Sequence, residues 1–514
     1  MTVPAPDVFL GLDLGTSGLK AVACSGSGVV LARSQGGYQT SRPERGAAEQ
    51  DPADWRNAVC TAFAELADAV APSRWRCVGL SAMVPTLVTT DDHGGPTGSA
   101  ITWEDARAEP QAVALAARTG DLYAVTGQRL DGRYLLPMLL RLAAENPECI
   151  ERTSWVLGAK DYLFWWLTGA PATDPSTAAG TGGYELESRR WNPAMRAALE
   201  GLLGRTPPRL PRILDPGTRS PIRPELASRL GVQQGLEICL GIADSVAGAV
   251  GLGAADAGDV AYLAGTSTVV LAVSERLDLD PRERFLVTPM ATEHEWGLEM
   301  DLLATGASVR WLASLFGIGE PELVADARKR DVSAAPAFLP FLAPGEQGAL
   351  WDPHLSGSIT GLTLRHDRGD LARGLLTGIV LESRRCLAVL ADRTGRAGVV
   401  HLGGGGMATA ETGQELADAT GRQVVVPEVA VDHSALGAAL LAARACGVRS
   451  AVEPGPTPGL RLLRPNPSAK QTWDLLASRH DALLAALGSR SPVDGAQRVG
   501  GWPGSLEAAA RPGD

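Results

Sequence analysis

The chain has 514 residues, more than one hydrophobic core usually organises, so we expect at least two domains. Its formal net charge of -11, without a lysine- and arginine-rich stripe interleaved with aromatics, argues against a nucleic-acid-binding protein. Its cysteines form no C-x-x-C pair, and we find neither a basic leader nor a long apolar run, so the sequence predicts a cytoplasmic protein without membrane contact.

The first predicted feature is a hairpin at residues 8–24, in which a polar glycine turn joins two apolar strands. Gly15, Thr16 and Ser17 combine backbone N–H groups that an anion can approach with hydroxyls that can donate hydrogen bonds. Asp13 adds a carboxylate that would repel phosphate unless a cation intervened, so we interpret it as a partner of Mg²⁺ or of an Mg²⁺-bound water. The Gly-Lys-Ser/Thr ending of a Walker A loop is missing. An ordinary hairpin turn is the alternative.

The following segments indicate an α/β domain, because predicted strands are followed by helices. Apolar residues at spacings of three and four predict an amphipathic helix at 55–70, and 110–168 is mainly helical. Residues 171–183 and 207–224 are rich in small residues and prolines and predict connecting loops. The predicted strands of this part are short apolar runs, at 29–32, 77–81 and 87–90.

A second strand-turn-strand unit is predicted at 260–273. Its turn, Gly265, Thr266 and Ser267, repeats the tripeptide of the first turn in the same setting. Two such units are what a duplicated domain with one phosphate-facing turn per copy would contain. A coincidental tripeptide is the alternative, and the shared context favours duplication.

Asp244 lies between the two copies, just before a run of small residues at 246–253 that predicts a helix. An isolated Asp in this position is most simply interpreted as a helix N-cap. At a junction where a cleft would form, its carboxylate could instead accept a proton from a substrate hydroxyl that attacks a phosphoryl group.

A later glycine run follows an apolar strand at 399–402 and includes Gly404, Gly405 and Gly406. Such a run lets a flat ring such as adenine lie against the backbone, and loop flexibility is the alternative. Around it the sequence predicts further elements, namely helices at 370–390, 414–419, 435–445 and 473–484, and a strand at 424–427.

Together these motifs resemble the FGGY family of carbohydrate kinases, in its xylulokinase-like branch. The resemblance spans residues 8–484 and rests on the order and spacing of several motifs: 13–20, 49–55, 103–107, 166–169, Asp244 in its loop, 265–267 and 404–406. It implies an α/β fold with the two lobes of the actin and sugar-kinase type, which is ribonuclease-H-like, and a central cleft for ATP and Mg²⁺. The lobes would comprise residues 1–243 and 244–487, and a disordered tail is predicted at 488–514.

The resemblance also implies roles for individual residues. Asp244 would be the catalytic base, and Asp13 would hold the metal ion. ATP would be bound by residues 15–17, 265–267 and 404–406. The substrate would contact Met83, Asp105, Arg107 and Asp244. Asp244 would deprotonate the acceptor hydroxyl while the two turns and the metal ion neutralise the transferring phosphoryl group.

The chain departs from the family pattern mainly on the sugar side. Where the resemblance implies Gly-Gln-Met-His-Gly, residues 82–86 place Pro85 at the histidine, and a proline side chain offers no hydrogen bond. Ser245 and Glu104 each replace an expected Asn, and Ala408 replaces a basic residue. The sequence therefore supports kinase chemistry more strongly than any particular sugar.

The implied activity is ATP-dependent phosphorylation of a sugar or polyol, with a ketopentose such as xylulose as first candidate. Ribulose, gluconate, glycerol and tetronate are alternative acceptors. An actin-like ATPase would not need Asp105 and Asp244 at a small-molecule pocket, and a sugar-binding pseudokinase would need neither Asp13 nor Asp244, so both are less favoured. The sequence leaves open which hydroxyl reacts and whether the chain forms a homodimer.

Overall fold

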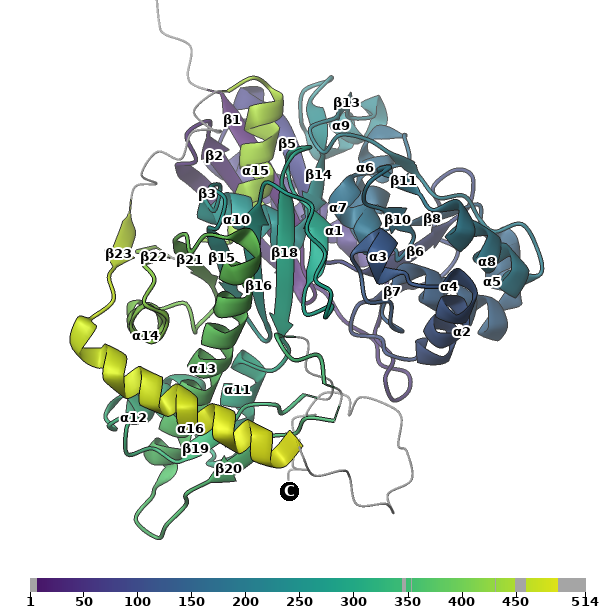
Figure 1. Ribbon diagram of the computed structural model, residues 1–514. Coiled ribbons are helices and arrows are strands. Elements are labelled where there is room, and N and C mark those ends of the chain that lie inside the picture. Colours follow the sequence, from purple (N-terminus) through teal and green to yellow (C-terminus); the bar gives the residue numbers. More distant parts are fainter. Residues whose placement is uncertain (1–6, 344–347, 353, 430, 449–458, 489–514) are drawn as a thin grey trace, which may run out of the picture.

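The computed structural model describes residues 7–343, 348–352, 354–429, 431–448 and 459–488. Two β-sheets form the centres of two lobes, and helices α10 (Asp244–Leu252) and α15 (His433–Ala445) lie between them (Figure 1). This arrangement confirms the predicted two-lobed α/β fold. The tail predicted at 488–514 falls outside the described residues, except for Gly488.

The first sheet contains the predicted opening hairpin. In chain order its strands are β1 (Val8–Leu14), β2 (Gly18–Ser25), β3 (Val30–Gly37), β5 (Trp75–Ala82), β13 (Arg219–Pro221) and β14 (Glu237–Ala243). They are arranged as β13-β14-β5-β1-β2-β3. Because β1 pairs antiparallel with β2 and parallel with β5, Lys20 and Ser81 are the register partners on either side of Asp13.

The second sheet repeats the arrangement of a hairpin beside a parallel strand. Its strands are β15 (Val260–Ala264), β16 (Thr268–Ser274), β17 (Leu286–Pro289), β18 (Trp296–Leu302), β21 (Val400–Gly404), β22 (Val424–Pro427) and β23 (Leu460–Leu463), in the order β17-β18-β16-β15-β21-β22-β23. β15 pairs antiparallel with β16 and parallel with β21, which aligns Ala264 with Gly404. The glycine run after β21 therefore lies next to the second turn.

Helices α10 and α15 meet through their backbones, because glycines occupy the points of contact. A Cβ atom at Gly437 of α15 would lie 1.8 Å from the carbonyl oxygen of Ala247 in α10. On its other side, α15 meets β1 in the same way, since a Cβ at Gly11 would lie 1.8 Å from the carbonyl oxygen of Ala435. Thus α15 covers the first sheet although it follows most of the second sheet in the chain. The predicted boundary at 243/244 separates the strands of the first sheet from those of the second. The assignment of residues 1–243 and 244–487 to the two lobes remains a prediction.

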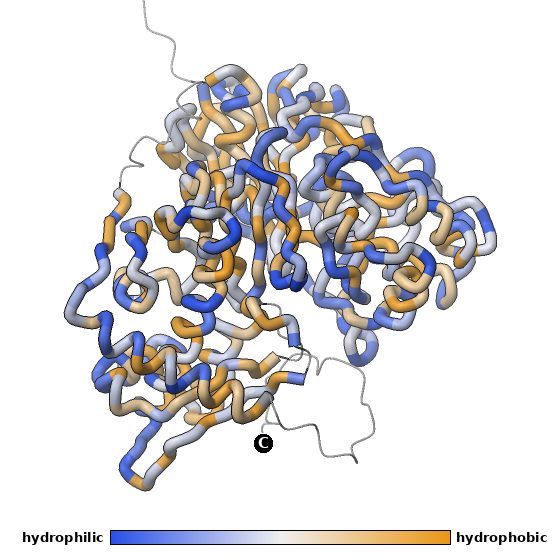
Figure 2. Tube along the Cα trace, in the orientation of Figure 1, coloured by the Kyte–Doolittle hydropathy of each residue, from blue (hydrophilic) through white to orange (hydrophobic). Residues whose placement is uncertain are grey.

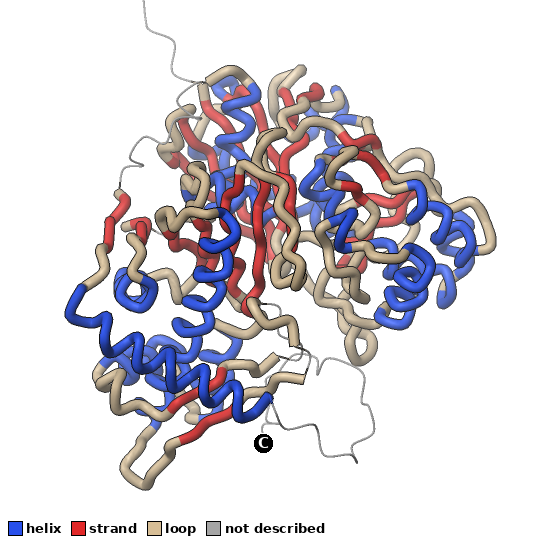
Figure 3. The backbone as a smooth tube through the Cα atoms, viewed as in Figure 1, coloured by secondary structure: helices blue, strands red, loops and turns tan. Residues whose placement is uncertain are grey.

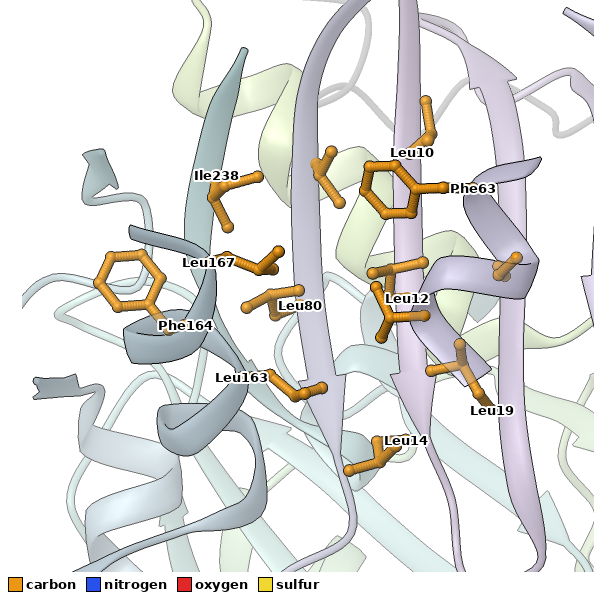
Figure 4. Packing of buried hydrophobic residues seen from close by; sticks show 14 of the residues in the cluster. Leu10, Leu12, Leu14, Leu19, Phe63, Leu80, Leu163, Phe164, Leu167 and Ile238 are labelled. Carbon is orange, nitrogen blue, oxygen red and sulfur yellow. The ribbon is translucent and has the colours of Figure 1, made fainter. Parts of the chain in front are cut away.

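The other face of the first sheet packs against α1 (Pro52–Ala69) and α6 (Ala159–Thr168). Figure 4 shows Phe63 of α1 beside Leu10 of β1, and Leu163 of α6 beside Leu80 of β5. Alternate residues of a strand point to opposite faces of the sheet. In β1, Leu10 therefore packs on the face covered by α1, and Gly11 lies on the face covered by α15. In Figure 2, apolar residues are concentrated along the strands and the helices between the lobes.

A long helix supports the second sheet. α13 (Arg368–Thr394) packs against β16 and β18, and Asp367 and Asp370 form a capping box at its start. Around it lie α11 (Gly306–Leu315), α12 (Glu320–Arg328), α14 (Ala410–Thr420), α16 (Lys470–Gly488), a 3₁₀ turn (Pro467–Ala469) and the short strands β19 (Ala337–Leu339) and β20 (Ser358–Thr360) (Figure 3). Within the described ranges no helix, α13 included, has the length and apolar character needed to cross a lipid bilayer.

The first lobe carries an additional small sheet with helices on the right of Figure 1. Its strands β4 (Glu49–Gln50), β6 (Thr86–Thr90), β7 (Ala100–Thr102) and β8 (Trp155–Leu157) are ordered β4-β7-β6-β8. The other elements of this lobe are a 3₁₀ turn (Pro72–Arg74), α2 (Glu109–Thr119), α3 (Tyr123–Thr126), α4 (Leu135–Glu145), α5 (Pro147–Arg152), β10 (Tyr184–Glu185), β11 (Arg190–Trp191), α8 (Pro193–Leu203) and α9 (Pro224–Leu230).

Short elements occur in the two segments that the sequence predicts as loops, so that prediction was wrong in part. Residues 171–183 contain β9 (Ala172–Thr173) and α7 (Pro175–Ala179), and 207–224 contain β12 (Arg212–Ile213) and β13. A five-residue helix is too short to show helical periodicity. Its sequence signal was the pair Asp174-Pro175, because Asp174 caps the helix and proline suits the first helical position.

Candidate active site

The first turn is held in place by side chains from three separate segments of the first lobe. Gln50 Nε2 donates to the carbonyl oxygen of Thr16 at 2.8 Å, and Trp103 Nε1 donates to the Thr16 hydroxyl at 2.9 Å. The Tyr38 hydroxyl donates to the carbonyl oxygen of Gly15. Ser17 lies exposed at the tip. Three side-chain hydrogen bonds therefore hold Gly15 and Thr16, while the exposed tip at Ser17 stays accessible.

Asp13 lies at the base of this turn and is 5% exposed. Its Oδ1 accepts a hydrogen bond from the Ser81 hydroxyl at 2.9 Å. Its register partner Lys20 forms a 2.8 Å ion pair with Asp432, which caps α15. Burial, and then the charge of Asp432, raise the pKa of Asp13 to about 7. Neither Lys20 nor Asp432 was singled out from the sequence, since their proximity depends on α15 returning to the first sheet.

The charge balance around Asp13 fits a divalent cation. The carboxylates of Asp13, Asp432 and Asp244 share the positive charge of Lys20. No three His, Cys, Asp or Glu side chains in the described part of the chain form a ready-made metal cage. Mg²⁺ commonly uses one or two carboxylates and completes its octahedron with water and phosphate oxygens.

Asp244 is the first residue of α10, and the N-cap position before it belongs to Ala243. The alternative interpretation of Asp244 as the N-cap was therefore wrong. Its Oδ1 accepts from the Ser245 backbone N–H at 3.0 Å, and the Ser434 hydroxyl donates to its carbonyl oxygen at 3.0 Å. Burial, and then the charges of Asp13 and Glu299, raise the pKa of Asp244 well above its usual range. A raised pKa makes a carboxylate a stronger proton acceptor.

Glu299 of β18 is a second partly buried carboxyl group beside α10, and sequence reasoning missed it. Its Oε2 accepts from the Ser245 hydroxyl at 3.2 Å and from the Thr288 hydroxyl at 3.1 Å. Burial, and then the charge of Asp301, raise the pKa of Glu299 to about 8. A signal existed in the sequence, because the otherwise apolar strand 296–302 carries carboxylates at two positions of one face.

The second turn and the glycine run lie against each other. The Gly405 N–H donates to the carbonyl oxygen of Ala264 at 2.6 Å. Gly404 has a φ of 112°, and a Cβ there would lie 2.1 Å from the same oxygen, so only glycine fits. On its other side the turn contacts α11, because the Ala307 N–H donates to the carbonyl oxygen of Thr266 at 3.0 Å. The structure thus places the second turn beside the glycine run, and the ATP-binding roles of 265–267 and 404–406 remain predictions.

Asp105 and Arg107 are bound to each other. The Asp105 side chain, 1% exposed, accepts from Arg107 Nε at 3.0 Å and from the Ala48 N–H at 3.1 Å. Arg107 also pairs with Glu49 at 2.7 Å and with Glu44 at 2.6 Å. Their role in substrate binding remains a prediction.

Met83 lies beside the first turn. It is 1% exposed, and its N–H donates to the carbonyl oxygen of Leu14 at 3.0 Å. This hydrogen bond continues the pairing of β5 with β1 beyond the end of the strand. The role of Met83 as a substrate contact remains a prediction.

Comparison with known proteins identifies both halves of the chain. The model of the FGGY family of carbohydrate kinases, N-terminal domain, matches residues 8–251, and its C-terminal domain matches residues 260–446. A xylulose kinase from Escherichia coli K12 is 31% identical over 438 residues, which are 85% of this chain and 89% of that protein. A gluconokinase from Bacillus licheniformis is 27% identical over 458 residues, covering 85% of this chain and 88% of that protein.

A solved structure agrees with these matches. The crystal structure of a xyloylose kinase from Brucella ovis superposes with a TM-score of 0.85 at 27% identity, covering 94% of this chain and 99% of that one. The predicted resemblance is confirmed by the two family models, by the relatives and by the fold. This chain belongs to the FGGY family of carbohydrate kinases.

Proposed function

We propose that the chain transfers the γ-phosphoryl group of ATP to a hydroxyl of a ketopentose such as xylulose. One observation carries the proposal: a partly buried carboxyl group, that of Asp244, lies at the N-terminus of α10, and the charge of Asp13 at the base of the first turn helps to raise its pKa. The 31% identity to a xylulose kinase supports the choice of acceptor.

In this mechanism the residues of the chain position the reactants and move one proton. Asp244 orients the acceptor hydroxyl and takes its proton as the oxygen attacks phosphorus. The backbone N–H groups and hydroxyls of turns 15–17 and 265–267 hold the phosphates, and 404–406 border the nucleoside. Asp13 would hold Mg²⁺, which neutralises charge on the phosphate oxygens when it is bound. Closure of the lobes would exclude water as a competing acceptor.

Gluconate is the second candidate acceptor, because a gluconokinase is among the similar proteins. It ranks second because that relative is 27% identical to this chain, against 31% for the xylulose kinase.

An ADP-release screen tests the proposal directly. Purified protein with ATP and Mg²⁺ is offered ketopentoses, pentitols, glycerol, gluconate and tetronates, and the product is identified by ³¹P NMR. We expect the highest kcat/KM with a ketopentose. Gluconate as the best acceptor would refute the choice of substrate. Hydrolysis that no sugar accelerates would indicate an actin-like ATPase, and nucleotide binding without turnover would indicate a pseudokinase.

Loss of the Trp103 hydrogen bond should weaken phosphate positioning. Trp103→Phe keeps an aromatic ring but removes the donor to the Thr16 hydroxyl, a net loss of about 1 kcal/mol. We expect kcat/KM for ATP to fall about fivefold. Trp191→Phe is the matched control, because it removes an indole hydrogen bond to the Pro211 carbonyl oxygen in another part of the first lobe. Equal kinetic losses in the two variants would contradict a role for Trp103 at the turn.

The metal assignment predicts a change in the Mg²⁺ requirement. Asp13→Asn removes the negative charge while keeping the side-chain size, so we expect the Mg²⁺ concentration for half-maximal turnover to rise about tenfold, as for loss of an outer-shell partner. The measurement is a Mg²⁺ titration at saturating ATP and acceptor. An unchanged Mg²⁺ dependence would remove Asp13 from this role.

A further inference from the structure

A buried ionic group lies in the first lobe behind Asp244. Lys160 Nζ is 2.8 Å from Asp161 and 3.1 Å from Asp174, and the three side chains are 0%, 2% and 1% exposed. Burial lowers the pKa of Lys160, but the two carboxylates outweigh it and raise the pKa overall, so the ammonium group stays charged.

Stability alone does not account for this group. Removing three charges from water is costly, and apolar residues of similar size often replace buried ion pairs without loss of stability. Asp161 also caps α6, through a 3.2 Å hydrogen bond from the Gly158 N–H. Asp174 instead contacts Ser176, whose hydroxyl contacts the residue before Asp244.

The contacts of Asp174 fix the direction of one hydroxyl. Asp174 Oδ2 accepts from the Ser176 N–H at 2.9 Å and from the Ser176 hydroxyl. A serine hydroxyl has one hydrogen, so donating it to Asp174 leaves the oxygen to act as an acceptor. The Ala243 N–H donates to that oxygen at 2.9 Å. The Lys160 ammonium group, 3.1 Å from Asp174 Oδ1, holds this carboxyl group where its Oδ2 accepts from the Ser176 hydroxyl.

Ala243 directly precedes Asp244, so this hydrogen bond fixes the point where β14 becomes α10. On the other side of Asp244, the Ser245 hydroxyl is bound by Glu299 of the second sheet. Asp244 is thus held between a contact from the first lobe and a contact from the second.

We propose that Ser176, oriented by Asp174 and Lys160, is a positioning residue that sets the location of the Asp244 carboxylate in the cleft. The inference rests on the proposed function, because it assigns Asp244 the role of base. Ser176 does not touch the reactants and acts through the backbone of Ala243. A small displacement of a catalytic group is enough to slow a reaction whose rate depends on alignment.

The test compares three variants of the full-length protein. Ser176→Ala removes the acceptor for Ala243, Ser176→Thr restores a hydroxyl, and Ser34→Ala is the matched control. Ser34 is likewise a buried serine whose hydroxyl donates to a carboxylate, that of Glu65 at 2.7 Å, on the other side of the first lobe. We expect kcat of Ser176→Ala to fall about tenfold, with KM for ATP within twofold of the unmodified protein. Ser176→Thr should recover most of kcat, and Ser34→Ala should change neither constant.

A second readout does not depend on turnover. Amide hydrogen exchange of a peptide that spans the end of β14 and the start of α10 should be faster in Ser176→Ala and unchanged in Ser34→Ala. If the unmodified protein releases no ADP in response to any acceptor, the proposed function is refuted. The positioning role of Ser176 is then decided by hydrogen exchange alone. Full kcat in Ser176→Ala with unchanged exchange would overturn it. Equal losses in Ser176→Ala and Ser34→Ala would also overturn it.

Discussion

Asp244→Asn is expected to lower turnover by about 10²–10⁴-fold, the contribution typical of a positioned general base. The amide has nearly the shape of the carboxylate and can still accept from the Ser245 N–H, so the fold of α10 should persist. It cannot take a proton from the acceptor hydroxyl. The phosphate turns do not include Asp244, and ATP should therefore bind with nearly unchanged affinity.

Coupled assays of ADP release measure turnover, and isothermal titration calorimetry measures the affinity for ATP. Glu225→Gln is the matched control, because Glu225 is also an acidic residue in the first turn of a helix, α9, but is exposed to solvent. It should leave turnover unchanged. Near-normal turnover of Asp244→Asn would exclude Asp244 as the base, and a parallel loss of ATP binding would point to a structural role instead.

Gly437→Ala is expected to destabilise the protein by about 1–3 kcal/mol, the usual cost of overpacking a close contact. The new methyl group would meet the Ala247 carbonyl oxygen at 1.8 Å, and backbone on both sides leaves no flexible side chain to move aside. The two helices would have to separate, which would also shift Asp244 at the start of α10. We therefore expect kcat to fall together with the unfolding temperature.

Gly201→Ala provides the control for helix propensity. Gly201 also lies within a helix, α8, but a Cβ there would meet only the end of the Arg118 side chain, at 3.1 Å. Replacing glycine by alanine at such a position stabilises by about 0.4–1 kcal/mol. Thermal unfolding of the two variants should move in opposite directions. A stabilising Gly437→Ala would show that the helices do not meet as described.

The features predicted from the sequence are those formed by residues close together in the chain. Both glycine turns sit in strand-turn-strand units with five to eight residues per arm, so alternation and turn residues were enough to find them. Asp244 was found because it lies at the junction of the two copies. The family resemblance then fixed the two-lobed fold, which periodicity alone would have left as an α/β protein.

The missed features are contacts between residues far apart in the chain. Asp432 reaches Lys20 because α15 returns to the first sheet, and Glu299 reaches Ser245 because β18 lies beside α10. No local pattern encodes such pairs. Asp105 and Arg107 show a contact of the opposite kind, because two residues only two positions apart in one motif form an ion pair.

The return of α15 to the first sheet also constrains how the chain can fold during synthesis. Phe9 and Cys77 of the first sheet share one apolar cluster with Ala439 and Ala442 of α15. The strands leave the ribosome early, but the helix that covers them emerges only after nearly all of the second lobe. Until then one face of the first sheet stays exposed, and exposed apolar surface favours aggregation. A fragment ending at 243 would carry that exposed face permanently, so we expect it to need residues 433–445, supplied in trans, to remain in solution.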